Sequence, residues 1–132
     1  MNCIIIDDDP DDRELFDIAL QNSRQPYHLT AIENGKKALE VLAEDMKAPD
    51  FIFLDLNMPM VSGKECLVAI KKMPNLKNTP VIIYSTSSYK NDVEETKDLG
   101  ASYFLPKTAD IDRLSEILSD ILTKKNLPFV LN

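Results

Sequence analysis

Short apolar runs alternate along the chain with longer segments in which apolar residues recur every three or four positions. The clearest run is Phe51-Ile52-Phe53-Leu54, which leads directly into Asp55. A short run of large apolar residues, rich in Phe and Ile, predicts a fully buried strand of a parallel sheet. Less regular runs predict further strands at residues 3–6, 27–32, 80–84 and 103–105.

Helical spacing follows each predicted strand, and we expect helices over residues 10–22, 38–46, 63–73, 90–99 and 111–122. The first of these helices presents Leu15, Ile18 and Ala19 on one face. The fourth has a thin apolar face, mainly Val93 and Leu99, so it should be the most weakly held helix. Strict alternation of strands and helices with short connections predicts one α/β domain, a five-stranded parallel sheet with helices on both faces.

The charge balance and the cysteines narrow the possible partners and environments. The chain has 15 basic and 22 acidic residues and a net charge of −7, which argues against nucleic acid as a direct partner. Cys3 and Cys66 stand among apolar neighbours without metal-type spacing, so we expect buried, reduced thiols in the cytoplasm. No apolar stretch approaches the ~18 residues that a membrane span needs, and we expect no membrane contact.

Polar residues stand at the ends of four predicted strands: Asp7 and Asp8, Asp55, Ser85 and Lys107. The carboxyl ends of parallel strands meet at one edge of a sheet, so these side chains should converge there. Neighbouring carboxylates repel one another unless a cation neutralises them, and hard oxygen ligands without His or thiolate suit Mg²⁺. A lysine and a hydroxyl beside a carboxylate nucleophile form a set of groups suited to phosphoryl transfer, with Asp55 as the phosphate acceptor.

This set resembles the receiver domain of two-component response regulators, and the resemblance covers nearly the whole chain. That family has an acidic pair after its first strand, the phosphorylated Asp after the third, Ser or Thr after the fourth and Lys after the fifth. The resemblance implies the flavodoxin-like strand order 2-1-3-4-5, a receiver domain over residues 1–125 and a C-terminal tail over residues 126–132. It also implies a stand-alone regulator that is not a conventional enzyme.

The resemblance also assigns roles around the phosphate acceptor. It implies that Asp7, Asp8, Asp55 and the backbone carbonyl of Asn57 hold Mg²⁺, with Asp8 as a direct ligand. Asp55 would take its phosphoryl group from a phosphohistidine of a sensor histidine kinase or a histidine phosphotransfer domain.

Further roles concern the response to phosphorylation. Lys107 and Ser85 would bind the phosphoryl oxygens, and Phe104 occupies the position of the family's switch aromatic. Phosphorylation would pull Ser85 toward the new oxygens, let Phe104 move inward and repack the face formed by the fourth helix, fifth strand and fifth helix. With no output module in the sequence, the signal is expected to pass to an unidentified downstream protein or through a homodimer.

Three features depart from the family pattern or stay open. Thr108 follows Lys107 where Pro is common, so we expect a trans peptide there. The apolar tail could pack on its own domain or on a second copy. Thr86, Ser87 and Ser88 offer hydroxyls that compete with Ser85 for its role.

Several alternative readings of the site also stay open. The acids at residues 7–9 could simply cap the first helix, as Asp9 is expected to do. Other uses of the fold are a phosphorelay intermediate, a receiver that only binds a partner, and a phosphohydrolase. The last usually needs an acid where this chain has Asn57.

Overall fold

The computed structural model describes residues 1–44, 47–87 and 89–132. Five parallel strands form a single sheet: β1 (Asn2–Ile6), β2 (His28–Ile32), β3 (Phe51–Leu54), β4 (Val81–Ser85) and β5 (Tyr103–Pro106). Their order is β2-β1-β3-β4-β5. This order confirms the predicted fold class and places the buried run β3 at the centre of the sheet.

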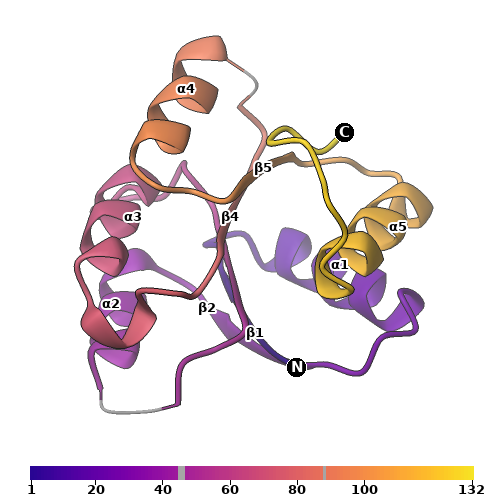
Figure 1. Cartoon of the computed structure of the whole chain (residues 1–132), viewed down its shortest axis with the longest axis horizontal. Coiled ribbons are helices and arrows are strands. Elements are labelled where there is room, and N and C mark those ends of the chain that lie inside the picture. The colour runs from indigo at the N-terminus through magenta and orange to yellow at the C-terminus, as the bar shows by residue number, and fades with distance from the viewer. Residues whose placement is uncertain (45–46, 88) are drawn as a thin grey trace.

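Helices cover both faces of the sheet (Figure 1). They are α1 (Pro10–Asn22), α2 (Gly35–Ala43), α3 (Gly63–Lys71), α4 (Lys90–Asp98) and α5 (Ile111–Leu122), with a 3₁₀ turn η1 (Pro74–Leu76) after α3. Helices α1 and α5 lie together on one face, and α2 and α3 pair on the other. None of the described helices is long and apolar enough to cross a membrane.

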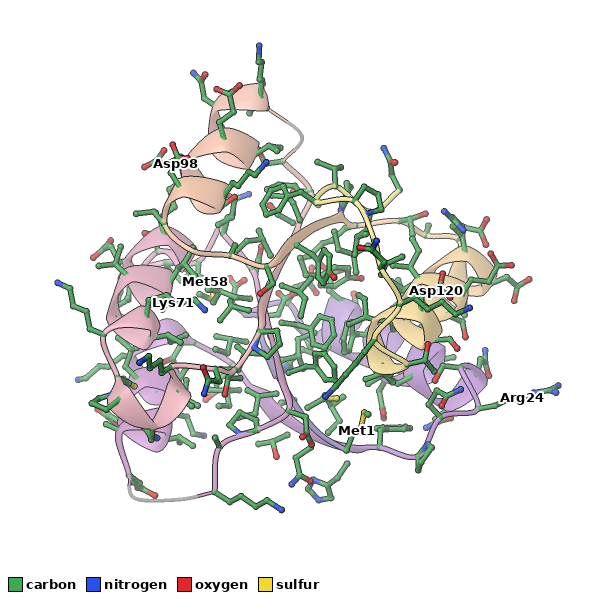
Figure 2. All side chains as sticks on the ribbon, viewed as in Figure 1. Met1, Arg24, Met58, Lys71, Asp98 and Asp120 are labelled. Atoms are coloured by element: carbon green, nitrogen blue, oxygen red, sulfur yellow. The ribbon has the colours of Figure 1, made fainter. Side chains whose placement is uncertain are left out.

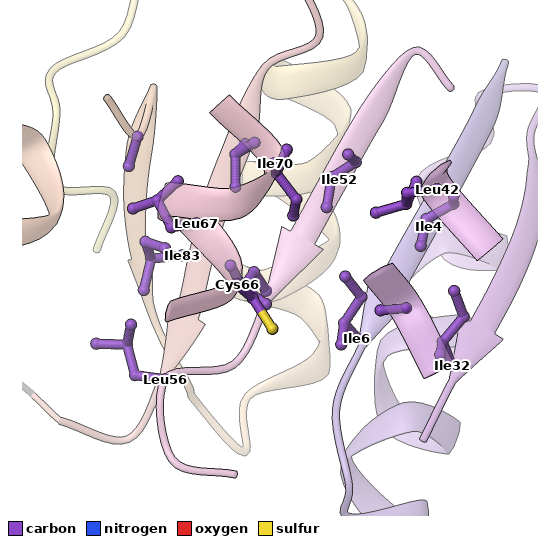
Figure 3. Packing of buried hydrophobic residues seen from close by; sticks show 14 of the residues in the cluster. Ile4, Ile6, Ile32, Leu42, Ile52, Leu56, Cys66, Leu67, Ile70 and Ile83 are labelled. Atoms are coloured by element: carbon purple, nitrogen blue, oxygen red, sulfur yellow. The ribbon is translucent and has the colours of Figure 1, made fainter. Parts of the chain in front are cut away.

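Two apolar clusters fill the spaces between the sheet and its helices. Successive strand residues point to opposite faces, so Ile4 and Ile52 pack toward α2 and α3 while Cys3 and Phe53 pack toward α1 and α5. Figure 3 shows the first cluster, in which Ile70 of α3 lies beside the strand residues. Both free cysteines are buried, as expected. All four residues of β3 are buried, which explains its unbroken apolar run.

The apolar face of α1 differs from the prediction. Phe16 and Ala19 are buried, together with Leu20, whereas Leu15 is half-buried and Ile18 is exposed. The buried face is centred on Phe16 because its ring packs on two aromatic rings of the sheet. Its centroid lies 4.7 Å from that of Phe53 and 5.3 Å from that of Tyr84. Aromatic packing of this kind buries more apolar area than Ile18 could on the same helix.

Helix α4 is weakly packed, as the sequence predicted. Thr96 is its one buried residue among those described. Polar contacts hold it instead: Lys64 of α3 lies 2.7 Å from a carboxylate oxygen of Asp92 and 2.8 Å from one of Glu95. Figure 2 shows the exposed Arg24 pointing away from the molecule at the edge of the view.

The C-terminal tail packs on its own domain, beside β5 (Figure 1). The N–H of Phe104 donates to the carbonyl of Phe129 at 2.8 Å, and the N–H of Leu131 donates to the carbonyl of Phe104 at 2.9 Å. Val130 forms an isolated parallel bridge with Phe104, and Leu131 is buried. The tail therefore covers part of the edge of the sheet. Two residues used in the sequence analysis, Met46 and Ser88, lie outside the described part.

Candidate functional site

The site is built from the loops that follow β1, β3, β4 and β5. Pairing of Ile6 with Leu54 brings the next residues of the two strands, Asp7 and Asp55, to the same edge. Backbone hydrogen bonds continue one step beyond the strands: the N–H of Asp7 donates to Ile32 and that of Asp55 to Ile6, both at 3.0 Å. Both carboxylates are therefore fixed by the sheet itself.

Asp7, Asp8 and Asp55 form an acidic cluster in which one carboxylate oxygen of each lies within 4.8 Å of the others. Asp7 and Asp55 are buried and Asp8 is exposed, so the cluster opens to solvent on one side. Among the described residues, Oδ2 of Asp7 has no well-aligned hydrogen-bond donor although it is buried. Carboxylate oxygens gathered this closely, and open to solvent on one side, are the hard ligands that Mg²⁺ takes at metal–oxygen distances of about 2.0–2.1 Å.

Asn57, the fourth expected metal-site residue, lies at the exposed mouth of the cluster. Its N–H donates to Oδ1 of Asp55 at 3.3 Å, which orients that carboxylate. The pKa of Asp55 is raised to about 6, mainly by burial and also by the negative charges of Asp7 and Asp8, although Lys107 and the Asn57 N–H act to lower it. The native fold therefore disfavours the ionised form of Asp55, and a bound cation would stabilise that form.

Lys107 reaches the cluster from the end of β5. Its Nζ atom lies 2.8 Å from Oδ2 of Asp12, 2.9 Å from Oδ2 of Asp7 and 3.6 Å from Oδ2 of Asp55. Only 9% of the side chain is exposed. Burial alone would lower the pKa of Lys107, but the hydrogen bond to Asp12 and the charges of Asp7 and Asp55 raise it above its ordinary value. Lys107 is therefore a permanent cation here.

Ser85 and Phe104 belong to β4 and β5, the paired strands that end at this lysine. Ser85 is the last residue of β4 and fully buried, its Oγ accepts from the N–H of Ser87 at 3.1 Å, and its carbonyl accepts from the N–H of Lys107 at 2.8 Å. Thr86, by contrast, is exposed. Phe104 pairs with Ile83 and has 0% of its surface exposed. The ring of Phe104 is therefore already in an inward position in this structure, and its backbone is hydrogen-bonded to the tail.

The loop after Lys107 matches the expected peptide geometry. No peptide bond between described residues is cis, so the Lys107–Thr108 bond is trans. The N–H of Asp110 donates to the hydroxyl of Thr108 at 3.1 Å, and Asp110 caps α5 through a hydrogen bond from Arg113. The loop thus joins the lysine directly to a capped helix.

Sequence reasoning missed three residues that shape the site. Asp12 contacts Lys107, and the ring of Tyr84 lies beneath the ammonium, 5.3 Å from its centroid. Gly63 begins α3 against the backbone of the loop that follows β3, where an added Cβ would lie 2.2 Å from the carbonyl oxygen of Asp55. No local pattern marks Asp12, because its contact is with a lysine at the far end of the chain.

Comparison with known proteins decides the family. The model of the response regulator receiver domain matches residues 3–119. The chain belongs to the response regulator receiver domain family. Response regulator Rcp1 of Synechocystis sp. is 29% identical over 123 residues, which cover 89% of this receiver and 84% of Rcp1. Two-component response regulator ORR5 of Oryza sativa subsp. japonica is 30% identical over 119 residues, covering 90% and 87%.

Solved receiver structures share the whole architecture. The crystal structure of the phosphorylated cyanobacterial phytochrome response regulator RcpA matches with a TM-score of 0.83 and 32% identity, covering 96% of this receiver and 97% of RcpA. The Mn²⁺-bound form of Rcp1 matches with a TM-score of 0.81 and 28% identity, covering 96% and 98%.

Proposed function

We propose that this receiver accepts a phosphoryl group on Asp55 from a phosphohistidine, in a reaction that needs Mg²⁺. The observation that carries this proposal is the position of Asp55, buried between an acidic pair and the ammonium of Lys107. The donor would be a sensor histidine kinase or a histidine phosphotransfer domain. The similar receivers RcpA, whose structure is of the phosphorylated protein, and Rcp1, whose structure is Mn²⁺-bound, support the two parts of the proposal.

The transfer is a substitution at phosphorus. A carboxylate oxygen of Asp55 attacks, the new O–P bond forms as the P–N bond of the donor breaks, and the histidine nitrogen keeps the electron pair and takes up a proton. Asp7, Asp8, Asp55 and the carbonyl of Asn57 would hold the metal. When bound, Mg²⁺ supplies positive charge that offsets the repulsion between these carboxylates and the incoming phosphoryl oxygens.

The remaining side chains bind and orient the transferred group. Lys107 supplies a second positive charge, held within reach of Asp55 by the end of β5. Ser85 offers a hydroxyl whose oxygen already accepts from Ser87, so its proton is free to donate to a phosphoryl oxygen. In this proposal the protein promotes its own phosphorylation and dephosphorylation and is not a conventional enzyme acting on a separate substrate.

The output would pass through the face formed by α4, β5 and α5. Helix α4 buries little apolar surface, and loosely packed elements are the ones that can rearrange at low cost. Ser85 would link phosphorylation of Asp55 to the rearrangement of this face, because its backbone carbonyl accepts a hydrogen bond from Lys107 and its strand is paired with β5. We propose a cytoplasmic regulator whose phosphorylated form engages a downstream protein or a second copy through this face.

Intact-mass measurement tests the proposal. The protein is incubated with acetyl phosphate and Mg²⁺, with and without excess chelator, alongside Asp55→Asn and the exposed control Asp50→Asn. We expect one phosphoryl adduct on the wild type and on Asp50→Asn. We expect no adduct on Asp55→Asn, and none on any of the proteins when the chelator removes the metal. A folded wild type that gains no adduct would instead indicate a receiver that only binds partners. Rapid loss of the adduct to an added phosphotransfer domain would identify a relay intermediate.

A further inference from the structure

Lys107 sits closer to Asp12 than to the residue it is proposed to serve. Its Nζ atom is 2.8 Å from Asp12 and 2.9 Å from Asp7, but 3.6 Å from Asp55. Asp12 lies on the first turn of α1, and its side chain is 30% exposed. Its carboxylate is not part of the group formed by Asp7, Asp8 and Asp55, so its contact is with the lysine and not with the candidate metal position.

The ring of Tyr84 completes the surroundings of the ammonium. The Nζ atom of Lys107 lies 5.3 Å from the ring centroid, within the distance at which a cation is attracted to an aromatic face. Tyr84 is 1% exposed, and its hydroxyl has no hydrogen-bond partner among the described residues. The ring is held by Phe16 of α1, 5.3 Å away between centroids. Helix α1 therefore supplies both the anion and the support for the ring.

In this structure the ammonium of Lys107 makes its shorter contacts with Asp12 and Asp7 and its longer one with Asp55. A lysine that neutralises phosphoryl oxygens on Asp55 must bring its donors toward Asp55, and Asp7 would be engaged with the metal. Asp12 is then the remaining anion that competes for the ammonium. We infer that Asp12 and the ring of Tyr84 hold Lys107 in a resting position, and that Asp12 must release the ammonium when Asp55 is phosphorylated. Asp12 is thus a positioning residue.

The inference rests on the proposed function. It predicts that removing the Asp12 charge speeds phosphorylation of Asp55, which a purely structural role of Asp12 does not predict. Asp12→Asn removes the competing charge and keeps the shape, so phosphorylation of Asp55 by acetyl phosphate at limiting Mg²⁺ should become faster, on the order of tenfold. Asp12→Glu restores a carboxylate and should return the rate toward that of the wild type. Asp11→Asn, an exposed acid on the same turn, should leave the rate within twofold.

A second measurement requires neither metal nor phosphate. In metal-free protein, NMR of the lysine ammonium groups reports how firmly Lys107 is held through the exchange of its protons with water. Asp12→Asn should accelerate that exchange several-fold, while Asp11→Asn should not. Tyr84→Phe keeps the ring and should behave as the wild type, whereas Tyr84→Leu should also loosen the ammonium.

The outcomes separate the inference from the proposed function. If the wild type gains no phosphoryl group, the proposed function fails, and the NMR comparison still tests the resting position. If the wild type is phosphorylated but Asp12→Asn reacts at the same rate with unchanged ammonium exchange, the inference is overturned. A slower Asp12→Asn would also overturn it, since Asp12 would then be aligning Lys107 for the reaction instead of competing for it.

Discussion

Replacing Asp55 by Asn should stabilise the metal-free protein. Asp55 is 5% exposed, and burial together with Asp7 and Asp8 raises its pKa to about 6 from an ordinary value of 3.8. That difference corresponds to about 3 kcal/mol by which the native fold disfavours the ionised carboxylate. Asn has nearly the same shape without the charge, so most of this free energy should be recovered at neutral pH.

The assay is urea denaturation followed by circular dichroism, with chelator present, for the wild type and Asp55→Asn. We expect an unfolding free energy about 2–3 kcal/mol higher for Asp55→Asn at pH 7.5. The exposed control Asp98→Asn should change it by less than about 0.5 kcal/mol. Saturating Mg²⁺ should narrow the gap, because the metal binds the native wild type more tightly than the variant.

The stability difference between Asp55→Asn and the wild type should depend on pH, and the direction of that dependence tests the reasoning. The native state holds a proton on Asp55 more tightly than the unfolded chain does, because its folded pKa is raised. The free-energy cost of keeping Asp55 ionised in the native fold is therefore fully present above pH 6 and disappears as the pH falls toward 3.8. The gap between Asp55→Asn and the wild type should close over that range. A gap that widens at low pH, or an Asp55→Asn protein less stable than the wild type at pH 7.5, would show that the carboxylate stabilises the metal-free fold.

Three further predictions follow from the site and the tail. Asp8→Asn should weaken Mg²⁺ binding about tenfold or more by calorimetry, with Asp98→Asn as control; equal affinity would remove Asp8 from the metal site. Gly63→Ala should lower the unfolding free energy by about 3 kcal/mol and slow phosphorylation, because its Cβ would lie 2.2 Å from the Asp55 carbonyl oxygen. An unchanged unfolding free energy and phosphorylation rate would mean that α3 can shift to make room. Leu131→Ala should cost about 2–3 kcal/mol and speed exchange of the Phe104 amide, unlike the exposed Pro128→Ala; unchanged exchange would show that the tail does not hold β5.

The sheet and the acidic cluster could be predicted because both follow from position along the chain. An apolar run long enough for one strand fixes where the strand ends, and in a parallel sheet every strand end lies at the same edge. Asp7, Asp55 and Lys107 therefore had to converge once the alternation of strands and helices was recognised. The weak packing of α4 could be predicted for a similar reason, since its sequence offers almost nothing apolar to bury.

The features that escaped prediction depend on contacts that no short-range pattern contains. The face of α1 is set by the rings that meet Phe16 from β3 and β4, so the spacing of Ile18 with its neighbours was misleading. Asp12 is one of several acids at the start of α1, where a favourable helix dipole explains them equally well. Its contact with Lys107 joins residues 95 positions apart in the sequence.

The tail changes how the α4-β5-α5 face can work. Both backbone polar groups of Phe104 are bonded to tail residues, and Lys97 of α4 lies 5.5 Å from the centroid of the Phe129 ring. On the other side, Arg113 of α5 donates to the backbone oxygen of Asn132 at 2.6 Å. The tail thus contacts all three elements of the proposed output face. Since the ring of Phe104 is already buried, a rearrangement of β5 that exposes this face must move the tail with it, and a partner must bind beside the tail or displace it.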